Sequence, residues 1–329
     1  MDWTPEALIE NARSFWTSSA IQTAVSLDVF TPLVAESLTE AELAEAIHCS
    51  PRGTRMLVAA MSALDLLRRE EGRVALTPFS RRYLCRNSSD YLGHIIKHFK
   101  HLTHAWGQLD EAVRSGTSPR HMEEHSEDER ESFLLGMLNM FMIQAGKTVP
   151  QIELGGRGRL LDLGGGTGSY AVQFCLRHSL LRATVFDLPT TRVFAEQHIE
   201  NQHLSDRIDF VGGNFEQDPL PGGFDIAWLS HILHGVGPDK AAEIVNQAAH
   251  ALVPGGLLLI QEFVVDNTCD GPLQSVLFGL NMLVNTPEGM AYTEQELRDM
   301  LLAAGTVRVE RLPLQLPGGL GIVAGYLPG

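Results

Sequence analysis

A glycine-rich turn after an apolar run is the first candidate for ligand-binding chemistry. Residues 159–163 read Arg-Leu-Leu-Asp-Leu, and the turn Gly164-Gly-Gly-Thr-Gly168 follows directly. Without Cβ atoms such a turn can adopt positive φ and let a nucleoside approach the backbone, while the helix behind it presents free N–H groups. Asp187 ends the next apolar run, where a carboxylate in a doubly wound sheet can accept ribose hydroxyls. The two features together indicate an adenosine ligand.

A dinucleotide site is one alternative for this turn, and a purely structural turn is another. The dinucleotide fingerprint has a further glycine where the helix packs against its strand, and Ser169 stands at that position here. Ser169 therefore argues against NAD as the ligand.

His234 and Glu262 extend the candidate site. Residues 224–229 and 257–263 are apolar runs that predict the fourth and fifth strands of the sheet, with a helix beginning at Pro238 between them. The carboxyl ends of such parallel strands lie side by side at the edge where open α/β sheets hold ligands, so both side chains are expected beside the glycine turn. Imidazole is largely neutral near pH 7 and accepts protons, which makes His234 a candidate general base.

The order of the apolar runs predicts an α/β fold with a mostly parallel, Rossmann-like sheet. Further strands are expected at 182–187 and 207–212, and an amphipathic helix at 293–305. Two last strands near 307–311 and 321–326 are separated by a short loop, so we expect them to pair as an antiparallel edge. A nicotinamide-binding sheet usually lacks such an edge.

The N-terminal part has the pattern of a winged helix. A capping box opens a helix over 39–47, a second helix starts after Ser50, and residues 68–76 suggest a small β hairpin with Gly72 at its tip. Winged helices often bind DNA, but acidic residues outnumber basic ones over 1–90, which disfavours contact with phosphates. The apolar stretch 20–30 is the expected surface for a second copy of the chain.

Composition limits the possible partners. The chain has 329 residues, of which 44% are hydrophobic and 20% charged, and a net charge of −15, which predicts two folded domains and disfavours nucleic acid or anionic membrane partners. No apolar run approaches the length of a membrane span, so a cytoplasmic protein is expected. The four scattered cysteines fit neither a zinc site nor a disulfide framework.

Histidines raise the question of a metal. His94, His98 and His101 share one face of an expected helix, and His231 lies three residues before His234. No Cys or carboxylate at a matching offset completes the first group, and the second group has no third ligand at a suitable offset, so we expect no metal site. The acidic stretch 121–131 is expected to be a solvated linker, and the domain boundary is placed between 1–120 and 121–329.

Six motifs together resemble those of one family. They are LLDLGGGTG, VFDLP, FVGGNF, FDIAWLSHILHG, ALVPGGLLLIQEF and NMLVNTPEGMAYTEQEL, in that order over nearly the whole chain. The chain resembles class I S-adenosylmethionine-dependent O-methyltransferases that act on small molecules, typified by plant caffeate and bacterial polyketide enzymes. The resemblance implies S-adenosyl-L-methionine as cofactor, a small and aromatic hydroxyl acceptor, and a homodimer formed through a winged-helix N-terminal domain.

The resemblance also assigns roles to individual residues. His234 matches the catalytic base of a Leu-His-Asp-Trp run, and Glu262 the carboxylate that orients it. The implied cofactor contacts are Asp162, Gly164, Gly166, Gly168, Asp187, Leu188, Asn214, Phe215 and Ser230. The implied acceptor contacts are Phe133, Met137, Met282, Asn285 and Thr286.

Three positions depart from the family pattern. Asn214 stands where an acidic residue usually accepts the adenine amino group, Gly235 replaces an Asp after the base, and Ala291 replaces a second orienting carboxylate, with Glu288 and Tyr292 as nearby polar alternatives. These departures leave carbon or nitrogen methylation, and non-methylating decarboxylation or hydroxylation, as alternatives. A ligand-sensing transcriptional regulator is a third, non-enzymatic alternative.

Overall fold

The computed structural model describes residues 3–119 and 127–329, which belong to two compact units. Unit 1 comprises Met1–Thr103 and Ser126–Asn139, and unit 2 comprises His104–His125 and Met140–Gly329. The domain boundary expected at residue 120 lies outside the described residues, as does the expected linker up to residue 126. From Glu127 onward the chain is helical, so the last part of the expected linker belongs instead to a helix.

Unit 1 is mainly helical. Its elements in chain order are α1 (Pro5–Ala12), α2 (Phe15–Ser26), the 3-10 helix η1 (Thr31–Val34), α3 (Glu40–Ala46), α4 (Pro51–Ala63), β1 (Leu67–Glu70), β2 (Arg73–Leu76), α5 (Pro78–Tyr83), most of α6 (Gly93–Trp106) and the first half of α8 (Glu127–Thr148).

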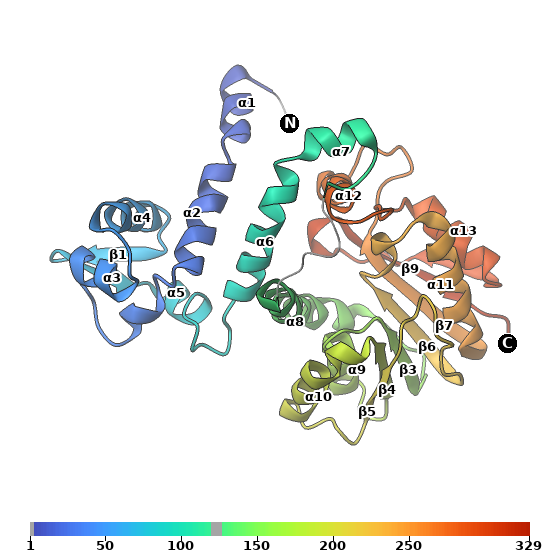
Figure 1. Ribbon diagram of the computed structural model, residues 1–329. Helices are drawn as coiled ribbons and strands as arrows, with labels where there is room; N and C mark the ends of the chain where they lie inside the picture. Colours follow the sequence, from blue (N-terminus) through green and yellow to red (C-terminus); the bar gives the residue numbers. More distant parts are fainter. Residues whose placement is uncertain (1–2, 120–126) are drawn as a thin grey trace. The chain divides into compact units, whose positions relative to one another are not determined.

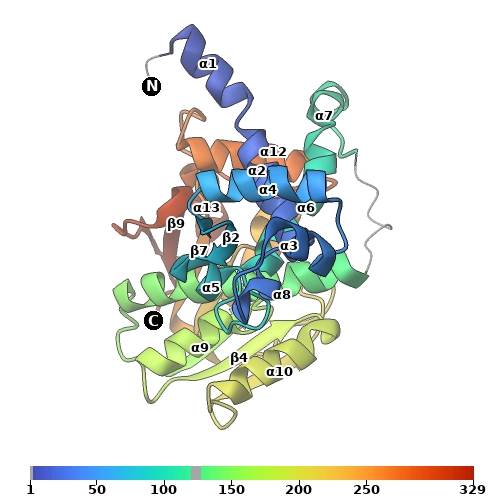
Figure 2. The same ribbon diagram turned by 90° about the vertical axis from the view of Figure 1, so that its left-hand side faces the viewer.

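The local signals expected in unit 1 are present. Thr39 and Glu42 form the capping box at the start of α3. Strands β1 and β2 pair antiparallel with Glu70 opposite Arg73, and both turn residues, Glu71 and Gly72, have positive φ (50° and 79°), as a two-residue hairpin turn requires. Figure 2 shows α3, α4 and β2 together at the centre of the view.

The apolar stretch 20–30 is exposed only in part, at Leu27. Ala24, Val25, Val29 and Phe30 are buried in the core of unit 1, because α2 and the turn after it pack against α4 and the hairpin. Apart from Leu27, the large exposed apolar side chains of this region lie earlier in the chain, on and beside α1 and at the start of α2. They are Trp3, Leu8, Ile9, Phe15 and Trp16.

Unit 2 holds the sheet. Its elements are α7 (Leu109–Ser115), the end of α8, η2 (Val149–Gln151), β3 (Arg159–Leu163), α9 (Ser169–Arg177), β4 (Arg182–Asp187), η3 (Pro189–Thr191), α10 (Arg192–Asn201), β5 (Ile208–Gly212), β6 (Phe224–Ser230), η4 (Leu233–Gly235), α11 (Pro238–His250), β7 (Leu252–Phe263), α12 (Leu273–Asn285), α13 (Glu294–Ala303), β8 (Arg308–Arg311), η5 (Pro317–Gly319) and β9 (Leu320–Tyr326).

The seven strands lie in the order β5-β4-β3-β6-β7-β9-β8. Strands β3 to β7 run parallel, and β9 pairs antiparallel with both β7 and β8, which confirms the expected reversed edge. The chain moves outward from β3 to β5 and then returns to β6 on the other side of β3. The turn after β3 therefore lies where the strand order reverses, which is where such sheets bind ligands.

Alternating side chains give the sheet two buried faces. Leu160 of β3 faces a core with α9 and α10, whereas Leu161 faces the core with α11 and α13. Figure 1 shows the two helical layers on either side of the strands. Because both faces are covered, β3 reads as a nearly continuous apolar run rather than an alternating one.

Candidate active site

The glycine turn after β3 has the left-handed backbone that its composition predicts. Gly164 and Gly166 have φ of 65° and 55°, a conformation that costs other residues free energy. Nothing lies within 4 Å of the point where a Cβ on Gly166 would stand, whereas a Cβ on Gly164 would meet Ile232 at 2.5 Å and Phe215 at 3.2 Å. The turn therefore presents bare backbone to open space at Gly166, with the Phe215 ring beside it.

Asp187 at the end of β4 joins the turn to the neighbouring strand. Its carboxylate accepts hydrogen bonds from the N–H of Gly166 (2.7 Å), the N–H of Leu188 (2.7 Å) and the hydroxyl of Thr191 (3.2 Å). Burial raises the pKa of Asp187 despite these bonds. A carboxylate offers about four acceptor positions, so roughly one is left for a ligand hydroxyl in this conformation, rather than the two expected.

Asp162 lies beneath the turn. Its side chain is buried, it accepts a hydrogen bond from the N–H of Ala171 (3.1 Å), and its carboxyl atoms lie 2.6–3.0 Å from where a Cβ on Gly165 would stand. Burial raises the pKa of Asp162 to about 7, because it outweighs the hydrogen bond from Ala171, which lowers the pKa, while the negative charge of Asp187 adds a smaller rise. A nearby cation would stabilise its ionised form.

His234 and Glu262 meet at the ends of β6 and β7, as the strand order predicts. Nδ1 of His234 lies 2.7 Å from Oε2 of Glu262, while Oε1 of Glu262 accepts the backbone N–H groups of Leu233 (3.0 Å) and His234 (3.3 Å). Burial alone would raise the pKa of Glu262, but its contacts with His234 outweigh burial and lower it. The ionised carboxylate therefore fixes Nδ1 as the protonated nitrogen and leaves Nε2 to accept a proton.

The loop after α12 wraps the segment that carries His234. The N–H of Met290 donates to the carbonyl of His234 (2.9 Å), and the hydroxyl of Tyr292 donates to the carbonyl of Val236 (2.6 Å). A Cβ on Gly289 would lie 2.4 Å from the carbonyl oxygen of His234. Met290 therefore holds the backbone of η4, and Tyr292 holds the residue directly after it. Ala291 packs beside Gly279: its Cβ lies 3.6 Å from the point where a Cβ on Gly279 would stand.

Aromatic rings surround His234, and the sequence reasoning missed most of them. Phe278 of α12 packs edge-on to the His234 ring (4.7 Å between centroids) and stacks on Phe263 (3.9 Å). His231 stacks on Phe141 of α8 (5.0 Å, 15° between planes) and packs against Phe263 (5.5 Å). The only sequence signal for this cluster was the apolar character of three separate segments, which is equally typical of an ordinary core.

A buried polar network lies behind these rings. The side-chain amide of Gln261 is within hydrogen-bonding distance of the Tyr170 hydroxyl (2.5 Å), of Nε2 of His231 (3.1 Å) and of the Ser230 hydroxyl (3.2 Å). Burial lowers the pKa of His231 to about 4, so its imidazole is neutral at pH 7. Ser230, an expected cofactor contact, is thus part of this network.

The other expected cofactor contacts lie around the same sheet edge. Asn214 follows β5, and its side-chain oxygen accepts the N–H of Glu216 (2.9 Å), so this oxygen already has one partner. Leu188 directly follows Asp187 and its side chain is exposed. An apolar side chain must be accessible in this way to contact the adenine of a cofactor. Their roles toward a cofactor stay predictions.

The expected acceptor contacts fall into two groups. Phe133 and Met137 lie on the part of α8 that belongs to unit 1, where Phe133 packs against His98 (5.2 Å). In unit 2, Met282 is buried, and Thr286 donates its hydroxyl to the carbonyl of Met282 (2.8 Å) at the end of α12. Asn285 donates to the carbonyl of Asn281 (2.8 Å). Their contact with an acceptor stays a prediction.

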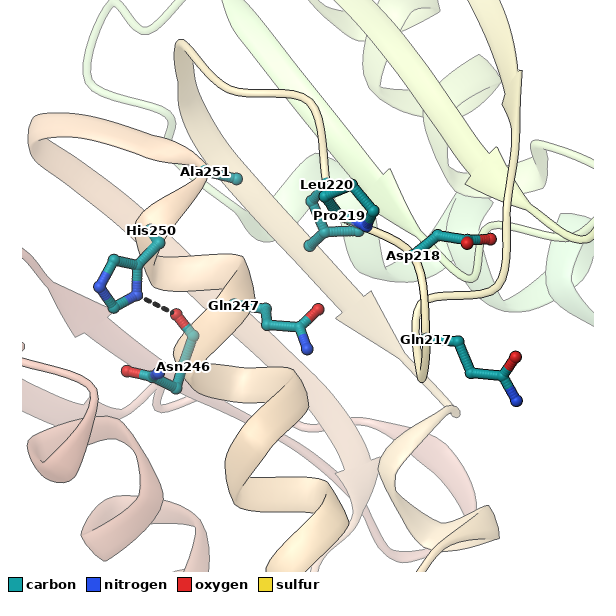
Figure 3. A pocket seen from close by; sticks show the side chains of 8 residues that line it. All are labelled: Gln217, Asp218, Pro219, Leu220, Asn246, Gln247, His250 and Ala251. Carbon is teal, nitrogen blue, oxygen red and sulfur yellow. Dashed lines mark hydrogen bonds between the residues drawn. The ribbon is translucent and has the colours of Figure 1, made fainter.

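A separate surface pocket of about 430 Å³ lies at the far end of α11 (Figure 3). It is lined by Gln217, Asp218, Pro219, Leu220, Asn246, Gln247, His250 and Ala251. Helix α11 begins four residues after His234, and its 13 residues span about 20 Å. The pocket is therefore remote from the proposed base. Among the residues that the structure describes, no helix is long and apolar enough to span a membrane.

Comparison with known proteins identifies the family of the chain. Residues 99–307 match the model of an O-methyltransferase domain, and residues 9–86 that of an O-methyltransferase dimerisation domain. Together with the strand order, these matches define the class of the protein as a methyltransferase with a Rossmann-like catalytic sheet. The chain belongs to the O-methyltransferase family.

Similar proteins span almost the whole chain. The 3-hydroxy-5-methyl-1-naphthoate 3-O-methyltransferase of Streptomyces sahachiroi is 32% identical, covering 98% of this chain and 95% of its own length. The tetracenomycin polyketide synthesis 8-O-methyltransferase of Streptomyces glaucescens is 31% identical, covering 97% and 96%. Human N-acetylserotonin methyltransferase, solved in complex with S-adenosylmethionine, is 27% identical with a TM-score of 0.88, covering 100% of this chain and 99% of that one.

Proposed function

We propose that the protein transfers the methyl group of S-adenosylmethionine to a hydroxyl group of a small aromatic molecule, with His234 as general base. The observation that carries the proposal is the 2.7 Å contact between His234 and Glu262 at the sheet edge that holds the glycine turn. Membership of the O-methyltransferase family supports the reaction class. The Gly235 and Ala291 departures leave this dyad intact.

The residues at the turn fit an adenosine-containing sulfonium. When bound, S-adenosylmethionine supplies the methyl group on a positively charged sulfur that is a good leaving group. Gly166 offers backbone without a side chain, Asp187 has a remaining acceptor position for a ribose hydroxyl, and Leu188 and Phe215 are apolar neighbours. The buried carboxyl of Asp162, whose pKa burial raises to about 7, fits the role of a partner for the ammonium group.

His234 provides the proton acceptor. A phenol titrates near 10 and needs a base at neutral pH. With Nδ1–H held by Glu262, Nε2 of His234 accepts the hydroxyl proton, and the Glu262 carboxylate stabilises the imidazolium that forms. In-line alignment of the two reactants supplies the remainder of the rate enhancement.

The surroundings of His234 support a flat acceptor. Phe278 packs against the base and stacks on Phe263, and Phe141 stacks on the neighbouring His231. Aromatic rings of this kind pack well on aromatic molecules. The named relatives act on a naphthoate, on tetracenomycin polyketides and on acetylserotonin, which are aromatic. We infer that the acceptor of this protein is also aromatic.

We also propose that the protein is a homodimer through unit 1. The match to a dimerisation domain covers residues 9–86, and Trp3, Phe15 and Trp16 are large apolar side chains left exposed. Their burial by a second copy would remove this surface from water. The substitution Trp16→Glu is expected to shift the mass measured by light scattering from dimer to monomer. We further infer a reducing, cytoplasmic location, because all four cysteines carry free thiols.

Incubation with S-adenosylmethionine and a panel of phenols tests the proposed function. Release of S-adenosylhomocysteine together with a methylated phenol is expected from the wild type. The variant His234→Ala is expected to lose 10²–10⁴-fold in turnover while binding S-adenosylmethionine with unchanged affinity in calorimetry. His250→Ala, at the remote pocket, is the matched control. Full activity of His234→Ala would refute the general base, and absence of cofactor binding by the wild type would refute the function.

A further inference from the structure

The sheet edge that carries His234 brings a second histidine into the same group. Ligand atoms of His231, His234 and Glu262 all lie within 4.8 Å of one another. Among the side chains that the structure describes, those of residues 3–119 and 132–329, no other set of three His, Cys, Asp or Glu comes this close. The two histidines are neighbours on one segment, and the carboxylate comes from β7, which is why sequence spacing left the group without a third ligand.

We propose that this triad binds a divalent transition metal ion of the zinc type, and that the bound ion blocks the base. Two imidazoles and one carboxylate form the protein ligands of many mononuclear zinc sites, with water at the fourth position. At metal–ligand distances of about 2.0–2.2 Å, tetrahedral ligand atoms lie roughly 3.4 Å apart. The His234–Glu262 pair, now 2.7 Å apart, must open by about 0.7 Å, and the ligand atom of His231, which lies within 4.8 Å of the other two, must approach by at most about 1.4 Å.

Glu262 is held in a position that suits a ligand. Its Oε1 is occupied by the backbone N–H groups of Leu233 and His234, and this leaves Oε2 facing Nδ1 of His234. Hydrogen bonds of this kind orient the ligands of metal sites and raise their affinity. An ion that enters between Oε2 and Nδ1 replaces the proton of their hydrogen bond.

His231 is also fixed in place. It is a non-glycine residue with left-handed backbone (φ 59°), a conformation that costs free energy and is found at functional sites. Its ring is clamped by the stack on Phe141 and the contact with the buried amide of Gln261. The proposed methyl transfer has no use for this imidazole, so its strained and supported placement beside His234 calls for another explanation, which a metal-binding role provides.

The donor atoms select the kind of ion. Nitrogen ligands favour Zn²⁺, Ni²⁺ and Co²⁺, whereas Mg²⁺ and Ca²⁺ prefer all-oxygen sites. Blocking follows from the chemistry of imidazole, which has one lone pair in its neutral form. Once that lone pair is on the metal, the other ring nitrogen carries hydrogen and His234 cannot accept a proton. The binding part of the proposal stands alone, and the blocking part rests on the proposed function.

Zinc binding measured by competition with a chromogenic chelator tests the site. All variants carry Cys269→Ser, because this exposed thiol could bind zinc itself. The parent protein is expected to bind one more Zn²⁺ ion per chain than the His231→Asn variant. Asparagine is chosen because it adopts the left-handed φ of this position more readily than most residues. His250→Asn, the matched control, is expected to bind as many ions as the parent, and Mg²⁺ is expected not to compete. Glu262→Gln is a second variant expected to lose the ion.

Methyl transfer provides an independent measurement. Micromolar Zn²⁺ is expected to inhibit the parent enzyme reversibly, with recovery on adding a chelator, and His231→Asn is expected to be at least tenfold less sensitive. Equal zinc stoichiometry in the parent and His231→Asn would overturn the site, whatever the activity. Zinc bound at this site in a protein without methyl transfer would refute the proposed function and leave the site standing.

Discussion

The backbone N–H of Met290 donates a 2.9 Å hydrogen bond to the carbonyl oxygen of His234. The proposed base is therefore held from two directions, by Glu262 at its side chain and by the loop 286–292 at its backbone. Each contact crosses between distant parts of the chain. Substitutions that disturb one contact and spare the other can separate their effects.

Gly289 tests the backbone contact. A Cβ at this position would lie 2.4 Å from the carbonyl oxygen of His234, so Gly289→Ala must push the loop or the base out of position. We expect kcat to fall at least tenfold, because small displacements of a catalytic group are costly, with little change in affinity for S-adenosylmethionine. Gly222→Ala, where nothing lies within 4 Å, is the control. Wild-type kcat in Gly289→Ala would show that the close approach has no role in positioning the base.

Glu262→Gln tests the side-chain contact. The amide keeps the shape of the carboxylate but removes the charge that stabilises the imidazolium and allows the wrong tautomer of His234. A loss of roughly 10²-fold or more in kcat is expected, with cofactor affinity retained in calorimetry. A variant that turns over at the wild-type rate would contradict the role of Glu262.

Asp162 makes stability depend on pH. Burial raises its pKa from 3.8 to about 7 in the folded protein. Between about pH 4 and pH 7 the unfolded chain therefore releases this proton more readily than the folded protein does. As a result, the protein without ligand loses stability as pH rises through this range. Asp162→Asn lacks this loss. As pH rises across this range, the free energy of unfolding of the variant is expected to increase relative to that of the wild type by about 1–4 kcal/mol. Melting temperatures measured at each pH check this. The exposed Asp209→Asn is the control, and a pH-independent difference would contradict the prediction.

Phe278 tests the aromatic surroundings of the base. Its edge-on contact with His234 is worth about 0.5–1.5 kcal/mol, and Phe278→Ala also removes a surface for a flat acceptor. We expect a higher KM for the phenol and a several-fold lower kcat, with unchanged cofactor affinity. Leu180→Ala, an exposed substitution, should match the wild type. An unchanged KM would place the acceptor elsewhere.

The fold and the placement of the candidate site residues were predictable because their signals are local or follow from topology. The apolar runs, the glycine turn and the capping boxes are short patterns. Parallel strands end at one edge, so the placement of Asp187, His234 and Glu262 together needed only the correct strand order. The expected apolar surface over residues 20–30 was wrong for Ala24, Val25, Val29 and Phe30, which are buried. An apolar stretch has the same sequence pattern whether it faces its own core or a partner.

The sequence by itself determined that a glycine turn, a carboxylate and a histidine would share one edge of a parallel sheet. Only the tertiary structure decided that Phe278 packs against His234, that Gly289 lies against its backbone, and that His231 joins Glu262 in one group of ligands. These contacts link segments far apart in the chain, and they depend on how α12, β7 and the loop after α12 pack. Contacts between side chains so far apart in the sequence depend on how the folded elements fit together, and no short sequence pattern encodes that fit.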